Sequence, residues 1–60
     1  MPEVLFEFVQ VGNAVKVSAI DSASGVEVSI VGSASLSRYT LQQAALRKLQ
    51  YVLKKRQKAR

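Results

Sequence analysis

The side chains that could do chemistry are few and lie far apart. Seven serines are present, but there is no histidine to activate one of them and no cysteine to act as a nucleophile. The acids are spread over the first half, at Glu3, Glu7, Asp21 and Glu27. Lys16 is an amine, but a nearby Glu7 would favour its charged, unreactive form. The sequence therefore predicts no enzyme acting alone, no metal or cofactor, and no small-molecule substrate.

Basic residues gather in the second half of the chain. Residues 1–36 carry a net charge of −3 and residues 37–60 carry +8, which gives +5 for the whole. Clustered lysine and arginine bind polyanions by releasing counterions, so contact with RNA or DNA phosphates is one interpretation. A solvated helix face is the other, because few aromatics are available to stack bases and Tyr51 is expected to flank the core. The candidate nucleic-acid contacts are Arg47, Lys48, Lys54, Lys55, Arg56 and Lys58.

Strands are predicted over residues 4–21, VLFEFVQVGNAVKVSAID. Gly12-Asn13 between two β-prone runs indicates a two-residue hairpin turn of type I′ or II′. Such a turn fixes the register, with Val11 opposite Ala14. Because side chains alternate between the faces of a sheet, one face then holds both phenylalanines and no charge. We expect that face to be the core.

A second turn is predicted at residues 21–25, DSASG. Asp21 suits the opening position because its side chain can accept from backbone N–H groups ahead, and Gly25 suits a left-handed closing position. A four-residue loop pairs Asp21 with Val26 and sends Val28 and its neighbours to the phenylalanine face. A three-residue loop would reverse every side chain of the third strand, so we expect the longer loop.

A helix is predicted after residues 32–35, GSAS, where Gly32 is read as a turn glycine like Gly12 and Gly25. Ser35 or Ser37 could cap it, and Thr40-x-x-Gln43 is a weaker capping-box match. Helical spacing places the apolar residues on one side, at Leu41, Ala45, Leu49, Val52 and Leu53. The predicted fold class is α+β: a single βββα domain over residues 1–60, with a three-stranded antiparallel meander, one C-terminal helix packed on one face, and a frayed basic tail from about residue 56.

One face of the predicted sheet remains uncovered, because a single helix covers only the other. A solvated face of β-branched residues is one interpretation. The alternative is a contact surface, since a 60-residue chain is marginally stable alone and has no disulfide to help it. The open rims of the outer strands offer another route to association. The candidate protein interface is Leu5, Val9, Val11, Ile20 and Val31.

Two segments resemble a family of very short uncharacterised bacterial proteins, mostly from alphaproteobacteria: FEFVQVGNAVKVSAID and ALRKLQYVLKK. Some members of that family carry a serine hydroxymethyltransferase label, but such an enzyme needs a large fold and a lysine pocket for pyridoxal phosphate. The resemblance implies a bacterial cytoplasmic protein without an established activity. No apolar run approaches the ~18 residues of a membrane span, and no basic segment suggests a secretory signal, so a cytoplasmic protein without a membrane partner is expected.

Together these features predict a small binding or structural module that acts through protein–protein contacts. Its expected partner is a second copy of itself, or another protein that the sequence does not identify. The alternative is a nucleic-acid-binding accessory protein that uses the basic C-terminal helix.

Overall fold

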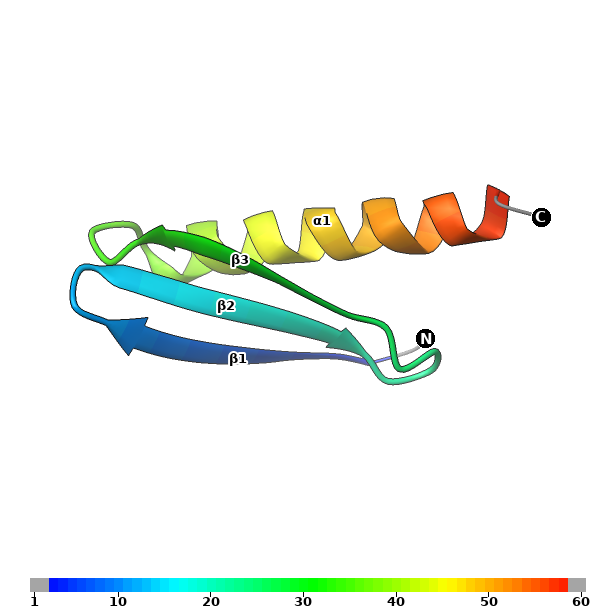
Figure 1. Ribbon diagram of the computed structural model, residues 1–60, viewed down its shortest axis with the longest axis horizontal. Coiled ribbons are helices and arrows are strands. Elements are labelled where there is room, and N and C mark those ends of the chain that lie inside the picture. The colour runs from blue at the N-terminus through cyan, green and yellow to red at the C-terminus, as the bar shows by residue number, and fades with distance from the viewer. Residues whose placement is uncertain (1–2, 59–60) are drawn as a thin grey trace.

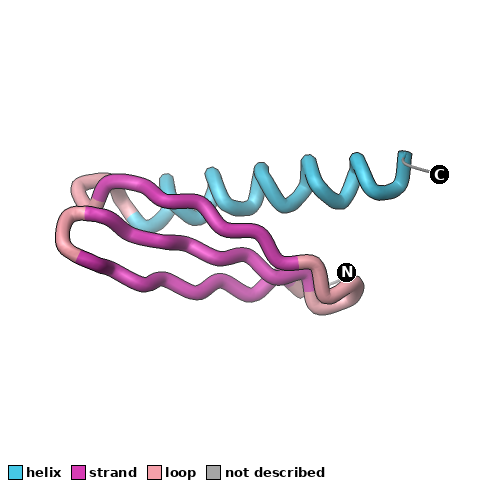
Figure 2. The backbone as a smooth tube through the Cα atoms, viewed as in Figure 1, coloured by secondary structure: helices cyan, strands magenta, loops and turns pink. Residues whose placement is uncertain are grey.

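The computed structural model describes residues 3–58, which form three strands followed by one helix (Figures 1 and 2). Strands β1 (Val4–Val11), β2 (Ala14–Asp21) and β3 (Glu27–Ser33) make one antiparallel sheet in the order β1-β2-β3. Helix α1 (Arg38–Lys58) lies along one face of this sheet, and its last turns extend past the β2–β3 turn (Figure 1). The predicted α+β, βββα arrangement is confirmed. The basic tail was expected to fray from about residue 56. Residues 56–58 belong to α1, and residues 59–60 lie outside the described residues.

The first hairpin has the predicted register, with Val11 opposite Ala14 and Phe8 opposite Val17. Gly12 has a φ of 59°, whereas Asn13 does not have a positive φ. A positive φ at the first central residue alone is the signature of a type II′ turn, so glycine is the residue that the turn requires. The side-chain amide of Gln10 also donates to the Gly12 carbonyl at 3.1 Å.

The second hairpin has the predicted four-residue loop. The Asp21 amide donates to the Val26 carbonyl at 2.9 Å, and Ala19 stands opposite Val28. Asp21 Oδ2 accepts from the Ser24 amide at 3.0 Å and from the Ser24 hydroxyl at 2.6 Å. Gly25 has a φ of 77° and donates its amide to the Asp21 carbonyl at 2.8 Å. Asp21 and Gly25 therefore have the roles that the sequence indicated.

The prediction that Gly32 is a turn glycine was wrong. Gly32 lies within β3, opposite Val15, and its φ is not in the left-handed region. A Cβ atom at this position would collide with the side chain of Leu41 on the helix. Glycine at this position lets the buried leucine pack against the bare backbone of the strand.

Ser37 is the helix cap. Its Oγ accepts from the Thr40 amide at 3.1 Å and donates to the Thr40 hydroxyl at 2.9 Å. Its carbonyl accepts the helical bond from the Leu41 amide at 3.1 Å. Ser35, the other candidate, belongs to the preceding turn, where its amide donates to the Ser33 hydroxyl at 3.1 Å. Ser37 and Thr40 thus fix where the helix begins.

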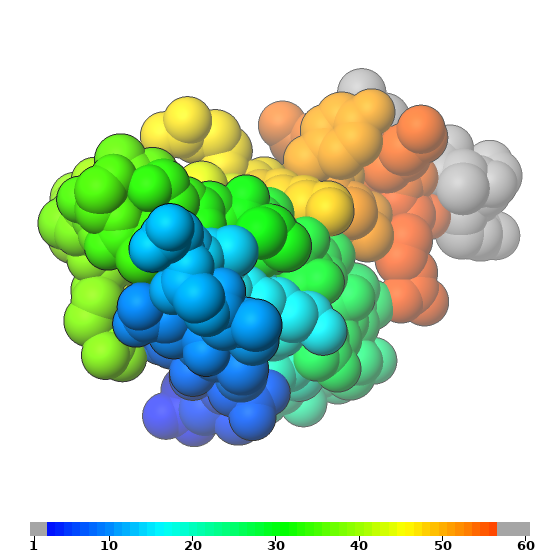
Figure 3. Space-filling model, turned by 60° about the vertical axis from the view of Figure 1, so that its left-hand side comes forward, coloured from blue at the N-terminus to red at the C-terminus, as the bar shows by residue number. Residues whose placement is uncertain are grey.

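The core lies on the predicted face, but the helix covers it unevenly. α1 packs mainly on β2 and β3. Phe6 and Phe8 on β1 are consequently only half-buried, although the face that holds both was expected to be the core. The guanidinium carbon of Arg38 lies 4.2 Å from the centre of the Phe8 ring and covers part of it. In the space-filling view the atoms of β1, in blue, lie on the lower side of the molecule, away from the yellow and orange atoms of the later turns of α1 (Figure 3). The buried apolar core is Val15, Val17, Ala19, Val28, Leu41, Ala45 and Leu49.

Candidate interaction surfaces

The sheet face away from α1, called here the open face, carries most of the exposed apolar side chains of the sheet. The exposed fractions are 51% for Leu5, 47% for Val9, 72% for Val11 and 71% for Val31. Ile20, the fifth residue of the predicted interface, also lies on this face but is half-buried. The register therefore brings all five predicted residues to one surface. The open face comprises Leu5, Glu7, Val9, Val11, Ala14, Lys16, Ser18, Ile20, Glu27, Ser29, Val31 and Ser33.

Charged and small polar residues interrupt the apolar part of the open face. Lys16 stands between Val9 and Val31 on the middle strand. Glu7 lies diagonally from it, opposite Ser18. Ser18 is buried although it belongs to the open face, so it lies at a low point between larger neighbours. The open face thus has a central cation, an adjacent anion and a depression.

The two outer edges of the sheet differ. On β3, the Lys48 ammonium donates to the Ser29 carbonyl at 2.8 Å. Ser29 and Ser18 form a non-hydrogen-bonded pair, so the backbone N–H and C=O of Ser29 point away from β2, toward the open edge of the sheet. Lys48 therefore occupies part of that edge. A lysine at this position hinders another strand from pairing there. On β1, the rim lies beside the half-buried phenylalanines, outside the cover of the helix.

The predicted nucleic-acid contacts point to more than one side of α1. Arg47, Lys48, Lys54, Lys55 and Arg56 are all exposed on α1. Lys48 turns toward the edge of β3. Arg47 and Lys54 lie on the side of the helix away from the buried Ala45 and Leu49. The side chain of Lys58, the sixth predicted residue, lies outside the described part of the chain.

Tyr51 does not flank the core as expected. Its side chain is 64% exposed, and the Lys55 ammonium lies 5.7 Å from the centre of its ring. Residues three and four apart are neighbours on a helix surface, so Arg47, Lys48, Lys54 and Lys55 all surround this tyrosine. At about 100° per residue, Tyr51 lies about 200° around the helix from Leu49, so helical spacing itself could have indicated its exposure.

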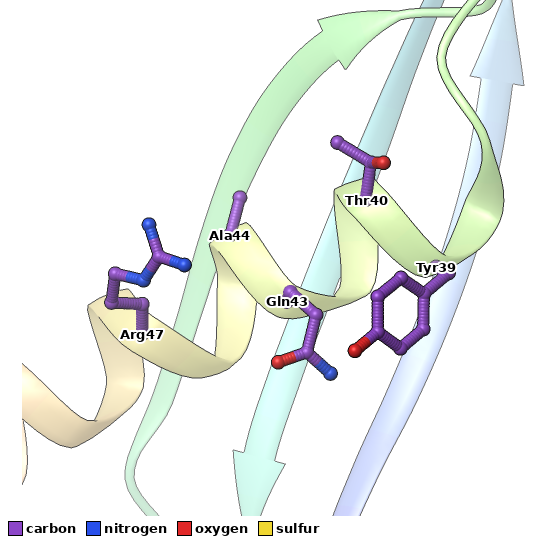
Figure 4. A pocket seen from close by; sticks show the side chains of 5 residues that line it. All are labelled: Tyr39, Thr40, Gln43, Ala44 and Arg47. Atoms are coloured by element: carbon purple, nitrogen blue, oxygen red, sulfur yellow. The ribbon is translucent and has the colours of Figure 1, made fainter.

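A hollow on the solvent side of α1 is a further surface feature, which sequence reasoning missed (Figure 4). Its lining residues are spaced three and four apart, and Ala44 lacks the bulk to fill the gap between longer neighbours. All of its walls come from one helix, so it stays open to solvent. The hollow is lined by Tyr39, Thr40, Gln43, Ala44 and Arg47.

No enclosed chemical centre is built within residues 3–58. No group of three potential metal ligands gathers among them. Their buried side-chain nitrogen and oxygen atoms all have hydrogen-bond partners, so no polar group points unpaired into a cavity. α1 also lacks an apolar stretch long enough to cross a bilayer. The function of this part of the chain therefore rests on its surfaces.

Comparison with known proteins gives one match. A family model described as "Domain of unknown function (DUF6898)" matches residues 1–56. No curated protein matches the chain, and no solved structure matches it.

Proposed function

We propose that this chain, which belongs to the DUF6898 family, is a small interaction module that associates with a second copy of itself through the open face. The observation that carries the proposal is the group of exposed apolar residues at Leu5, Val9, Val11 and Val31. They lie on the one broad face of the sheet that α1 does not cover. Apolar patches of this kind on small domains commonly mark contact sites.

The energetics of a short chain support a second copy on this face. A domain of about 60 residues buries only about 60% of its unfolded surface, which makes it marginal as a monomer. Removing apolar surface from water stabilises by about 25 cal/mol per Å², so covering the four exposed side chains strengthens the folded state. The proposal also places the dimer in the bacterial cytoplasm, as the resemblance of residues 6–21 and 45–55 implies.

The first prediction concerns the mass of the protein in solution. Sedimentation equilibrium at micromolar concentration should give twice the 6.6 kDa of the chain. Replacing Val9 and Val31 together by threonine keeps the β-branched shape that suits a strand but adds hydroxyl groups to the contact. Dimerisation should then weaken by about tenfold or more, because the hydroxyls lose water on association.

The control replaces Tyr39 and Tyr51 by glutamine. These are also large exposed side chains, but they lie on α1 rather than on the open face. This variant should dimerise as the parent does. A parent protein that remains monomeric up to millimolar concentration would remove the proposal.

A second function, nucleic-acid binding by α1, is favoured by one observation. Tyr51 is exposed and lies among basic residues, which provides the base-stacking group that the sequence alone did not supply. Phosphate contacts from the lysines would hold a single strand while the ring stacks on a base.

The test of this second function is a salt titration of binding to a mixed-sequence single-stranded RNA. Replacing Lys54 and Lys55 by glutamine should lower the slope of log K against log[salt] by about 1.4, since each lost phosphate contact on a single strand contributes about 0.7. Replacing Lys16 and Arg38 removes the same charge away from Tyr51 and should change the slope much less. Equal losses from both variants would show non-specific attraction only, and no binding at low salt would exclude this function.

A further inference from the structure

The cross-strand pairing arranges the open face in four rows of three side chains. Each row contains one residue from each strand, and its members are directly opposite one another in the ladder. The rows, from the β1–β2 turn downward, are Val11–Ala14–Ser33, Val9–Lys16–Val31, Glu7–Ser18–Ser29 and Leu5–Ile20–Glu27. This pattern can be tested for its fit to a copy of itself.

Two copies that stack face to face with full overlap have a two-fold axis between them, in the plane of the contact. The axis runs either along the strands or across them. An axis along the strands keeps each row at its own level and places the middle strand over itself. Lys16 then lies over Lys16 of the second copy, and two like charges meet at the centre of the contact.

An axis across the strands inverts the order of the rows and keeps each strand over its own copy. Full overlap places this axis between the Lys16 row and the Ser18 row. On β2 and β3 a large residue then always meets a small one. The facing pairs are Lys16 with Ser18, Val31 with Ser29, Ile20 with Ala14, and Glu27 with Ser33 of the second copy. Ser18 is buried at a low point, which leaves space for the Lys16 stem.

The facing pairs on β1 supply the apolar and charged parts of the same contact. Leu5 meets Val11 of the second copy, and both side chains are exposed in the single chain. Glu7 meets Val9, which lies in the same row as Lys16 on the neighbouring strand. Neighbouring strands are only about 4.8 Å apart, so Glu7 of one copy comes beside Lys16 of the other, twice by symmetry. Face-to-face sheets with their strands nearly aligned are a common packing mode.

We infer that two copies stack their open faces with strands antiparallel, each copy placing Lys16 beside Glu7 of the other. The inference rests on the proposed self-association and adds its geometry. Shape supports it through the alternation of large and small residues on β2 and β3. Charge supports it because the alternative axis opposes two lysines, whereas this axis forms two ion pairs.

The charge part of the inference is tested by mixing two variants. Lys16→Glu alone puts two acids side by side in the homodimer, and Glu7→Lys alone puts two bases there. Each variant should dimerise about tenfold more weakly than the parent. A mixture of the two should form a heterodimer at least as tight as the parent, because both contacts then join opposite charges. A mixture that associates no better than either variant alone would overturn the inference.

The facing of rows between the two copies is tested by cross-linking introduced cysteines. The chain has no cysteine of its own, so only the introduced ones can react. Leu5→Cys mixed with Val11→Cys should give a covalent heterodimer with a short bismaleimide. The matched control mixes Val11→Cys with Ser33→Cys, a pair that meets only if the axis runs along the strands. A dimeric protein that links Val11 to Ser33, or that links neither pair, would overturn this geometry while the proposed function stands. A protein that stays monomeric in sedimentation would overturn both.

Discussion

At the scale of single residues, Asp21 makes four hydrogen bonds in the β2–β3 turn. Its amide donates to the Val26 carbonyl, and its carbonyl accepts from the Gly25 amide. Its carboxylate accepts hydrogen bonds from the Ser24 amide and hydroxyl. It is also one of the few buried polar side chains in the described chain, with 6% of its surface exposed. A short acidic side chain is needed because it must accept two bonds from a residue only three positions ahead.

Replacing Asp21 by alanine should lower the free energy of unfolding by about 2 kcal/mol, because the bonds to a charged acceptor are lost. Asp21→Asn keeps one acceptor oxygen and should lose less than half of that. Urea unfolding followed by circular dichroism, at one fixed protein concentration, measures both. If alanine and asparagine cost the same, the hydrogen bonds at Ser24 would not be the source of the stability.

At the scale of elements, the positions of the strands and the helix followed from local patterns. The Gly12-Asn13 pair, the DSASG loop and the apolar alternation each depend on neighbours in sequence, and the register they predicted is confirmed. Gly32 was misread for a different reason, and Tyr51 because its angle around the helix, about 200° from Leu49, was overlooked. Whether a strand glycine faces a leucine depends on where the helix sits across the sheet. Local periodicity does not determine that lateral position, nor did it reveal that β1 lies outside the cover of α1.

The start of α1 provides a prediction at the same scale. The sequence left Ser35 and Ser37 as alternative caps, and only Ser37 bonds to an amide in the first turn of the helix. Ser37→Ala should therefore lower the free energy of unfolding by about 1 kcal/mol, the usual cost of removing a helix cap. Ser35→Ala is the matched control and should cost less than half as much, because its hydroxyl bonds only to the Ser33 hydroxyl. Thermal melts of both variants beside the parent decide this, and equal losses would contradict the assignment.

At the scale of the whole molecule, charge and apolar surface lie on opposite sides. Most of the chain's positive charge is on α1, while the open face combines Lys16 with Glu7 and Glu27. In the stacked dimer the two sheets are about 10 Å apart, and each helix lies about 10 Å beyond its own sheet. The helices are then separated by about 30 Å, several times the Debye length of about 8 Å at physiological salt. Repulsion between two copies of net charge +5 is therefore largely screened in this arrangement.

The stability of the folded protein should consequently depend on its concentration. If unfolding separates the copies, each tenfold rise in concentration stabilises the dimer by about 1.4 kcal/mol, which for 120 residues raises Tm by about 5 °C. The variant with threonine at positions 9 and 31 should show the same dependence at about tenfold higher concentration, because it weakens the contact rather than the monomer fold. Added salt should leave the parent's dependence almost unchanged, since the helices are far apart, whereas a contact through α1 would strengthen steeply with salt. A Tm that stays constant over a hundredfold range of concentration would mean that the exposed valines of the open face are simply solvated.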